Sequence, residues 1–280
     1  MRYSIKDQAI ERLGKALRPL GLTKGATPPK VLQAQLDSVL NGFEKIVRLR
    51  NTCIPWGPPE FKQLGIPQPE CHELGVSAAF AENCHFRQLR IRSGQAFMVH
   101  PLQAWWLVRV AGGSFVEQQA ALIHDAPEDG PQNTKWTSPF ILEAAHHHFG
   151  RKVGRLTEQL TNIEPPEQSL SYQEKLDLAD ALSAEAKPLR AAESTCNARD
   201  VVFHPNPAWG RHDIHDQLEF RCLILHHTEP VPELVWALFE NTMELARGWY
   251  GEEVIPAIYT GLPRPALRPG FGPSLRSPSY

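Results

Sequence analysis

A histidine–aspartate pair and an acidic pair follow an apolar segment in the middle of the chain. The pairs are His124-Asp125 and Glu128-Asp129, and the segment before them reads AALI. An ionised carboxylate beside such a segment has to be solvated, paired or bound to a cation. Imidazole and carboxylate together form a mixed nitrogen and oxygen site, which suits Mn²⁺, Fe²⁺ or Zn²⁺ better than Ca²⁺. A single His-Asp dipeptide also occurs as an ordinary surface pair, so the metal prediction depends on what surrounds it.

The acidic pair is placed where it could assist a metal. Glu128 lies four residues after His124, and Asp129 lies four after Asp125. Residues four apart share a face if the helix continues, so both carboxylates would lie beside the metal ligands. Such carboxylates orient an attacking water or move protons. Pro127 opposes a continuous helix, because it removes a hydrogen bond or ends the helix near Asp125.

Most elements that must position these residues are predicted to be helices. Capping boxes begin at Ser114 and Ser171, and Ser138 precedes a proline suited to a first helical position. Apolar spacing predicts further helices over 5–20, 30–50 and 232–248. No segment alternates with a period of two residues, so we expect an all-α fold without a sheet.

Proline and glycine divide the chain into three parts. Residues 53–75 contain five prolines, which predicts an irregular strap rather than a continuous helix. We therefore expect an N-terminal helical extension with this strap over residues 1–85 and a main domain over 86–258. Residues 259–280 are rich in Pro, Gly, Ser and Arg, which predicts a disordered tail.

The composition excludes several classes of protein. The 280 residues include 29 Lys and Arg and 31 Asp and Glu, for a net charge of −2, and 42% are hydrophobic. The hydrophobic fraction is enough to bury a core, which argues against wholesale disorder. The nearly neutral charge argues against a protein that mainly coats nucleic acid. No apolar stretch is long enough for a membrane helix. The amphipathic N-terminal segment lacks the apolar run of a secretory signal peptide. We expect a cytoplasmic protein.

The five cysteines are predicted to be reduced thiols, because they are scattered and odd in number. Cys71-His72 and Cys84-His85, with Cys53 upstream, offer a zinc site as an alternative. The CxxC spacing that favours such a site is absent. The groups His146–His148, His212/His215 and His226-His227 are read mainly as surface residues.

Several motifs occur together in one order along the chain. They are SGQAF at 93–97, HPL at 100–102, AALIHD at 120–125, ED at 128–129, a helix pattern from Ile141 through Phe149-Gly150 to Thr161, and AKPLRAAESTCNARD at 186–200. This arrangement resembles the hydrolase domain of the RelA/SpoT family, an all-helical HD-type metal-dependent phosphohydrolase. It is most similar in form to the small alarmone hydrolases, which lack a synthetase domain. The resemblance covers about residues 90–200.

The resemblance implies a four-ligand metal site, with Mn²⁺ as the expected ion and other divalent transition metals as alternatives. The implied ligands are His100, His124, Asp125 and Glu193. Glu193 is a departure, because the family has aspartate there, and the extra methylene changes the reach of the carboxylate. Asp180 is the rival for this place. We prefer Glu193, because Asn197 and then Arg199-Asp200 follow it in register.

The resemblance also implies roles for further side chains. Glu128 and Asp129 are the expected catalytic pair, which positions and deprotonates the attacking water. Asn197 is expected to contact the nucleotide. Arg92 is expected to face its base or phosphates, with Arg90 as the second candidate. Lys187 and Arg190 are expected to bind pyrophosphate oxygens. Ile91 stands where the family often has a basic residue, which bears on selectivity for the base.

The implied activity is hydrolysis of (p)ppGpp to GDP or GTP and pyrophosphate, in housekeeping or as an antitoxin to an alarmone synthetase. One alternative is another 3′-phosphorylated nucleotide, such as an adenosine alarmone, NADPH or a pyrophosphorylated tRNA end. The other is a non-catalytic nucleotide-binding regulator with a decayed site. The expected partners are the nucleotide and, through residues 1–85, a protein or a second copy. Neither a membrane nor extended nucleic acid is expected.

Overall fold

The helix-start signals coincide with helix boundaries in the computed structural model of the chain, which describes residues 29–50, 56–162, 170–261 and 267–268. Ser114 and Ser171 each accept a hydrogen bond from the backbone N–H three residues later, as expected for capping boxes. The helix over Ser138–Leu160 has its N-cap at Thr137, one residue before the predicted cap. The helix predicted over 5–20 lies outside the described residues.

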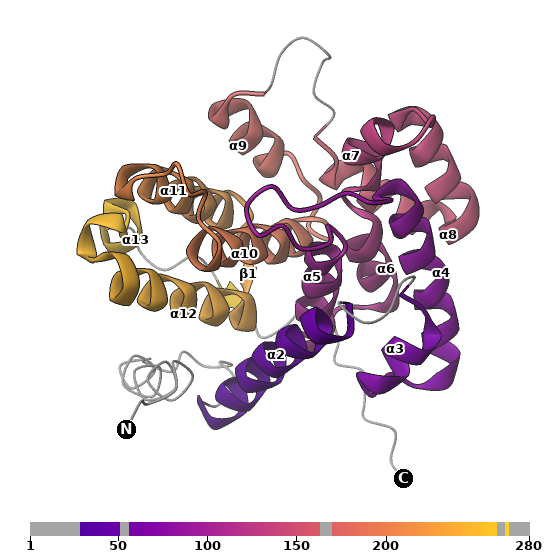
Figure 1. Cartoon of the computed structure of the whole chain (residues 1–280), viewed down its shortest axis with the longest axis horizontal. Helices are drawn as coiled ribbons and strands as arrows, with labels where there is room; N and C mark the ends of the chain where they lie inside the picture. Colours follow the sequence, from indigo (N-terminus) through magenta and orange to yellow (C-terminus); the bar gives the residue numbers. More distant parts are fainter. Residues whose placement is uncertain (1–28, 51–55, 163–169, 262–266, 269–280) are drawn as a thin grey trace.

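Helices dominate the described residues, which confirms the all-α class (Figure 1). They are α2 (Pro29–Arg50), α3 (Pro58–Gln63), α4 (Gln68–Cys84), α5 (Val99–Val110), α6 (Phe115–Ile123), α7 (Ala126–Asn133), α8 (Ser138–Leu160), α9 (Tyr172–Asp180), α10 (Lys187–Phe203), α11 (Arg211–His227), α12 (Glu233–Tyr250) and α13 (Ala257–Gly261), with a 3₁₀ turn at Glu252–Val254. Two short segments, β1 (Val231–Pro232) and β2 (Leu267–Arg268), pair in parallel. No described helix is long and apolar enough to cross a membrane.

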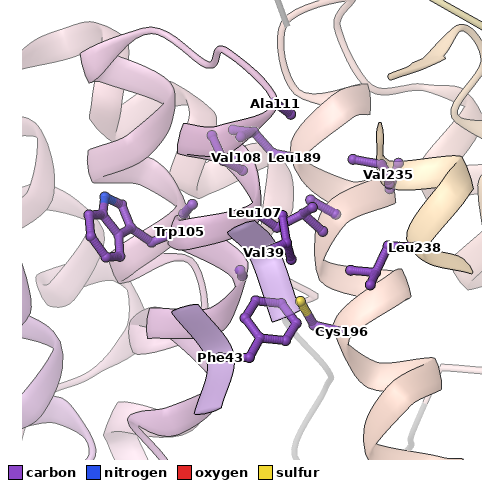
Figure 2. Close-up of a cluster of buried hydrophobic side chains, with 14 of the residues drawn as sticks. Val39, Phe43, Trp105, Leu107, Val108, Ala111, Leu189, Cys196, Val235 and Leu238 are labelled. Carbon is purple, nitrogen blue, oxygen red and sulfur yellow. The ribbon is translucent and has the colours of Figure 1, made fainter. Parts of the chain in front are cut away.

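The core is built around α5, which contacts α2, α6 and α10. Figure 2 shows side chains of α2, α5, α10 and α12 meeting in one cluster, among them Phe43, Leu107, Leu189 and Leu238. Burying an aliphatic or phenyl side chain of this size stabilises the fold by about 1.5–3 kcal/mol. The cluster therefore fixes α5 and α10 against each other, and these helices carry His100 and Glu193.

The proline-rich region is more regular than predicted. Residues 58–63 form α3 and residues 68–84 form α4, so the prediction of an irregular strap over 53–75 is wrong for these segments. The prolines start helices instead of excluding them, because Pro58 and Pro69 lie in first turns, where a missing N–H costs little. Helix α4 packs against α6 and α7, the elements of the predicted metal site.

The end of the chain also departs from its prediction in part. Residues 259–261 belong to α13, and residues 267–268 form β2, so these five residues are ordered into elements. The rest of the predicted tail lies outside the described residues. Helix α8 contains one break, at Gly150, whose φ of 85° is readily adopted by glycine.

Candidate functional site

Three of the four predicted ligands meet where α5 passes the junction of α6 and α7. His100 lies in the first turn of α5, and His124 and Asp125 form the junction. Asp125 Oδ1 lies 3.0 Å from His124 Nε2, and Asp125 Oδ2 lies 3.6 Å from His100 Nε2. One ligand atom from each of the three lies within 4.8 Å of the others, as a shared metal ion requires.

Pro127 shapes this junction, as the sequence suggested. Helix α6 ends at Ile123, and α7 begins again with Pro127 in its first turn. The carbonyl of Asp125 accepts the N–H groups of Glu128 (3.2 Å) and Asp129 (3.0 Å), so the acidic pair is fixed one turn after the ligand. The break between the helices lets His124 and Asp125 lie together while both acidic side chains face the same cavity.

The donor atoms fit a divalent cation. His124 Nδ1 lies 2.9 Å from the carbonyl oxygen of Ala121, which assigns a proton to Nδ1. His124 Nε2 is buried and has no hydrogen-bond partner among the described residues, although the Asp125 carboxylate is close. A ligating histidine is held in this way, with its second nitrogen bonded to a carbonyl.

Electrostatics at the three residues favour a positive charge between them. Burial alone would lower the pKa of His124, but the carboxylates of Asp125 and Glu193 and the carbonyl of Ala121 together raise it to about 9. Burial alone would raise the pKa of Asp125, but the neighbouring imidazoles, His124 above all, hold it well below its usual range. Burial, aided by the nearby Arg90, keeps the pKa of His100 well below its ordinary value, so this ring is neutral and able to ligate.

The acidic pair faces the same cavity, which has a volume of about 200 Å³. Burial, followed by the charge of Asp125, raises the pKa of both Glu128 and Asp129 to about 7. Glu128 Oε2 also accepts the backbone N–H of Asn162 at 3.1 Å, which fixes its direction. Groups with a pKa near neutrality can both take and return a proton, as a general base in hydrolysis must.

Of the two arginines proposed for the nucleotide base, the structure brings Arg90 to the cavity. Arg90 donates hydrogen bonds to Asn197 Oδ1 (2.9 Å) and Asp200 Oδ2 (2.8 Å). It lies on a tight turn in which Gly94 has a φ of 65°. Arg92, the preferred candidate, does not line the cavity and stacks on Trp209 with its guanidinium carbon 4.6 Å from the ring centre.

The predicted phosphate-binding residues are divided in the same way. Arg190 and Asn197 line the cavity, whereas Lys187, in the first turn of α10, does not. Lys175 of α9 and Arg221 of α11 line it instead, and neither was predicted from the sequence. Arg221 stands in the sequence between two apolar residues, Phe220 and Cys222, which are both buried in the structure. A cation between apolar neighbours was the available signal.

Glu193 lines the cavity and is 7% exposed, but it lies outside the group of three ligands. Its carboxylate accepts hydrogen bonds from Asn197 Nδ2 and from Arg190 Nη1, the latter at 3.2 Å. Its rival, Asp180, does not line the cavity and forms an ion pair of 2.8 Å with His227 on α11. The fourth ligand therefore stays a prediction, and Glu193 is the candidate that the fold places nearby.

The zinc alternative has no geometric support in the described residues. Cys71 and Cys84 are buried free thiols, and neither belongs to a group of residues able to share a metal. Cys53 lies outside the described residues. A second His/Asp group, His212, His215 and Asp216, lies on α11 with His212 exposed, in accord with its reading as a surface group.

The chain is similar in sequence to two pyrophosphohydrolases and to a probable pyrophosphokinase. No family model matches the chain. Two curated relatives are the guanosine-3′,5′-bis(diphosphate) 3′-pyrophosphohydrolases MESH1 of Mus musculus and Homo sapiens, each 26% identical over 159 residues, which are 56% of this chain and 84% of the relative. A probable GTP pyrophosphokinase of Mycobacterium leprae is 33% identical over 98 residues, 34% of this chain and 11% of that protein.

The fold comparison agrees with these relatives. A solved structure of a metazoan ortholog of SpoT, described as hydrolysing ppGpp and acting in starvation responses, matches with a TM-score of 0.51 and 18% identity. The match covers 65% of this chain and 97% of that one. With two buried histidines and an aspartate at one point of this fold, the chain is similar to hydrolases of the RelA/SpoT HD type.

Proposed function

We propose that the chain is a Mn²⁺-dependent 3′-pyrophosphohydrolase of guanosine 3′,5′-bis(diphosphate) and its pentaphosphate, and that residues 86–258 carry this activity. The observation that carries the proposal is that His100, His124 and Asp125 form one group able to share a metal, and that His100 and Asp125 of this group line one small cavity with Glu128 and Asp129. The names of the MESH1 relatives support the substrate class.

The proposed reaction is hydrolysis of the bond between the 3′ oxygen and phosphorus. Water attacks this phosphorus, the P–O3′ bond breaks, the 3′ oxygen takes a proton, and pyrophosphate leaves with GDP or GTP as the other product. His100, His124 and Asp125, with Glu193 proposed as the fourth ligand, would hold a divalent cation, which would lower the pKa of nearby water and offset phosphate charge.

The protein's own groups supply proton transfer and charge. Glu128 and Asp129, with pKa values near 7, accept the proton of the attacking water and pass a proton to the 3′ oxygen. Arg190, Lys175 and Arg221 surround the cavity with positive charge, which suits a pyrophosphate group. Arg90 and Asn197 are joined by a hydrogen bond, so they would hold the nucleoside as a unit.

A second substrate class is favoured by the side chains around Arg90. Ile91 is 97% exposed, and Arg92 stacks on Trp209, so neither adds a contact to the cavity. With fewer contacts to read a guanine base, another 3′-phosphorylated nucleotide is the alternative substrate. The antitoxin role, the cytoplasmic location and the docking role of residues 1–85 stay predictions from the sequence.

Hydrolysis tests the proposal directly. Purified protein with Mn²⁺ is incubated with ppGpp and with a panel of 3′-phosphorylated nucleotides, and released pyrophosphate and phosphate are measured. We expect pyrophosphate from ppGpp, and loss of this activity in His124→Ala and Asp125→Asn. His212→Ala, in the exposed group on α11, is the matched control and keeps the activity. Binding of ppGpp by the metal-loaded protein without turnover would establish the non-catalytic regulator instead.

A further inference from the structure

A second cavity, of about 500 Å³, lies between α2 and α10. It is larger than the catalytic cavity and falls within the usual volume of small-molecule sites, about 300–1,000 Å³. Its lining includes Phe43, Val47 and Arg48 of α2, Gln103 of α5, and Arg199 and Phe203 of α10. Arg199 follows Asn197 by two residues, or about 200° around the helix, so it faces away from the residues of α10 that line the first cavity.

Arg199 forms no ion pair with any carboxylate of the described residues. Its guanidinium carbon lies 4.8 Å from the ring centre of Phe203 and 5.7 Å from that of Phe43. Its Nη1 donates to Asn241 Oδ1 at 3.3 Å, and within the described part of the chain no carboxylate lies within ion-pair distance. Burial lowers the pKa of the Arg199 guanidinium to about 10. A desolvated charge without a counter-ion destabilises a protein unless an anion is supplied.

The remaining charges on the lining leave room for such an anion. Arg48 is exposed on α2 and adds a second guanidinium. Asp200 also lines the cavity, but its carboxylate is paired with Arg90 at 2.8 Å. Glu44 is the other acid on the lining. Apart from Asp200, the cavity is therefore lined by two guanidinium groups and one carboxylate.

The apolar part of the lining indicates the rest of the ligand. Phe43, Val47 and Phe203 supply apolar surface, and 40% of Phe203 is exposed. Aromatic side chains stack favourably on flat rings, and apolar lining with a few convergent polar groups is typical of small-molecule sites. The chemistry of the cavity therefore combines a flat apolar surface with guanidinium groups.

We propose that the cavity between α2 and α10 binds a small organic anion with a flat apolar ring. The anionic group lies at Arg199 and Arg48, and the ring packs against Phe43 and Phe203. This site is separate from the metal centre, and its existence does not depend on the proposed hydrolysis. A ligand there would lie one side chain from the catalytic cavity, because Asp200 lines this site and holds Arg90 in the other.

Binding of a fluorescent probe tests the proposal. The full chain in EDTA is titrated with 8-anilinonaphthalene-1-sulfonate, an aromatic monoanion, and with N-phenyl-1-naphthylamine, which has the same rings without the sulfonate. We expect Arg199→Met to weaken binding of the anion at least tenfold and Arg48→Gln to weaken it severalfold. The matched control, Arg155→Met on the exposed side of α8, leaves the affinity unchanged. The neutral probe binds more weakly than the anion and does not respond to Arg48→Gln.

Either of two results would overturn the proposal. The first is equal affinity of the anion for the wild type and for Arg48→Gln, an exposed substitution that leaves the core intact. The second is equal affinity of the anionic and neutral probes for the wild type. If Arg199→Met fails to give the native circular dichroism spectrum, Arg48→Gln and the pair of probes decide the outcome alone.

Discussion

Glu193 has to exchange partners if it is the fourth metal ligand, and Arg190 is the partner it would leave. In the structure Arg190 Nη1 donates to Glu193 at 3.2 Å, and only 11% and 10% of the two side chains are exposed. A hydrogen bond between charged, largely buried groups contributes about 1.5–3 kcal/mol. If Glu193 binds the metal, part of the free energy of its hydrogen bond with Arg190 is lost. Removing Arg190 is therefore expected to tighten Mn²⁺ binding by about tenfold, or ~1.4 kcal/mol.

A double-mutant cycle separates this exchange from general electrostatics. Isothermal titration of metal-stripped protein gives the Mn²⁺ dissociation constant for the wild type, Arg190→Gln, Glu193→Gln and the double variant. We expect Glu193→Gln to weaken binding by at least about a hundredfold, because loss of even an outer-sphere partner costs about 10–100-fold. In that background Arg190→Gln is expected to have much less effect. An equal effect of Arg190→Gln in both backgrounds, or unchanged binding in Glu193→Gln, would refute the assignment of Glu193 as a ligand.

Three further results are expected. Since His124 has a pKa of about 9 in the metal-free protein and must lose a proton to ligate, Mn²⁺ affinity should rise about tenfold per pH unit from pH 7 to 9. Titrations in buffers of different ionisation enthalpy should show about one proton released, and none released would contradict this. Arg90→Ala should raise the KM for ppGpp far more than Arg92→Ala does, whereas equal effects would show that both contact the nucleotide. Trp105→Ala should lower the free energy of unfolding by about 3–5 kcal/mol in urea denaturation, because Trp105 is fully buried against Phe61, and a loss below about 1 kcal/mol would contradict its place in the core.

The sequence predicted those parts of the molecule that local signals control. Capping serines and apolar spacing gave the helices that begin near Pro29, Phe115, Tyr172 and Glu233, because these signals act within one or two turns. Pro127 likewise predicted the break at the metal site. The prolines of residues 53–75 led to the wrong prediction of an irregular segment. The sequence alone does not distinguish a proline in the first turn of a helix from a proline that ends a helix. Only the tertiary contacts of α4 with α6 and α7 distinguish the two.

The sequence did not reveal which cations line the cavity, because the direction of a long side chain depends on contacts far along the chain. Arg90 and Arg92 are equivalent by local pattern, yet Arg90 meets Asp200, 110 residues later, and Arg92 meets Trp209. Lys175 and Arg221 come from α9 and α11, which contact each other, and no motif connects them to the histidines. His124 and Asp125 could be paired from the sequence because they are adjacent, whereas His100 joined them only through the resemblance of the motifs to a known family.

Helix α10 explains why a single segment carries so much of the chemistry. Arg190, Glu193 and Asn197 recur at intervals of three and four residues, so one face lines the catalytic cavity. Arg199 and Phe203 occupy the other face and line the second cavity. Asp200 lies between the two faces, lining the second cavity and pairing with Arg90 of the first. A rotation of α10 about its axis would therefore change both cavities together, whereas a substitution confined to one face would leave the other lining intact. This is why Arg48→Gln and Arg190→Gln, on separate linings, should have independent effects on probe and metal binding.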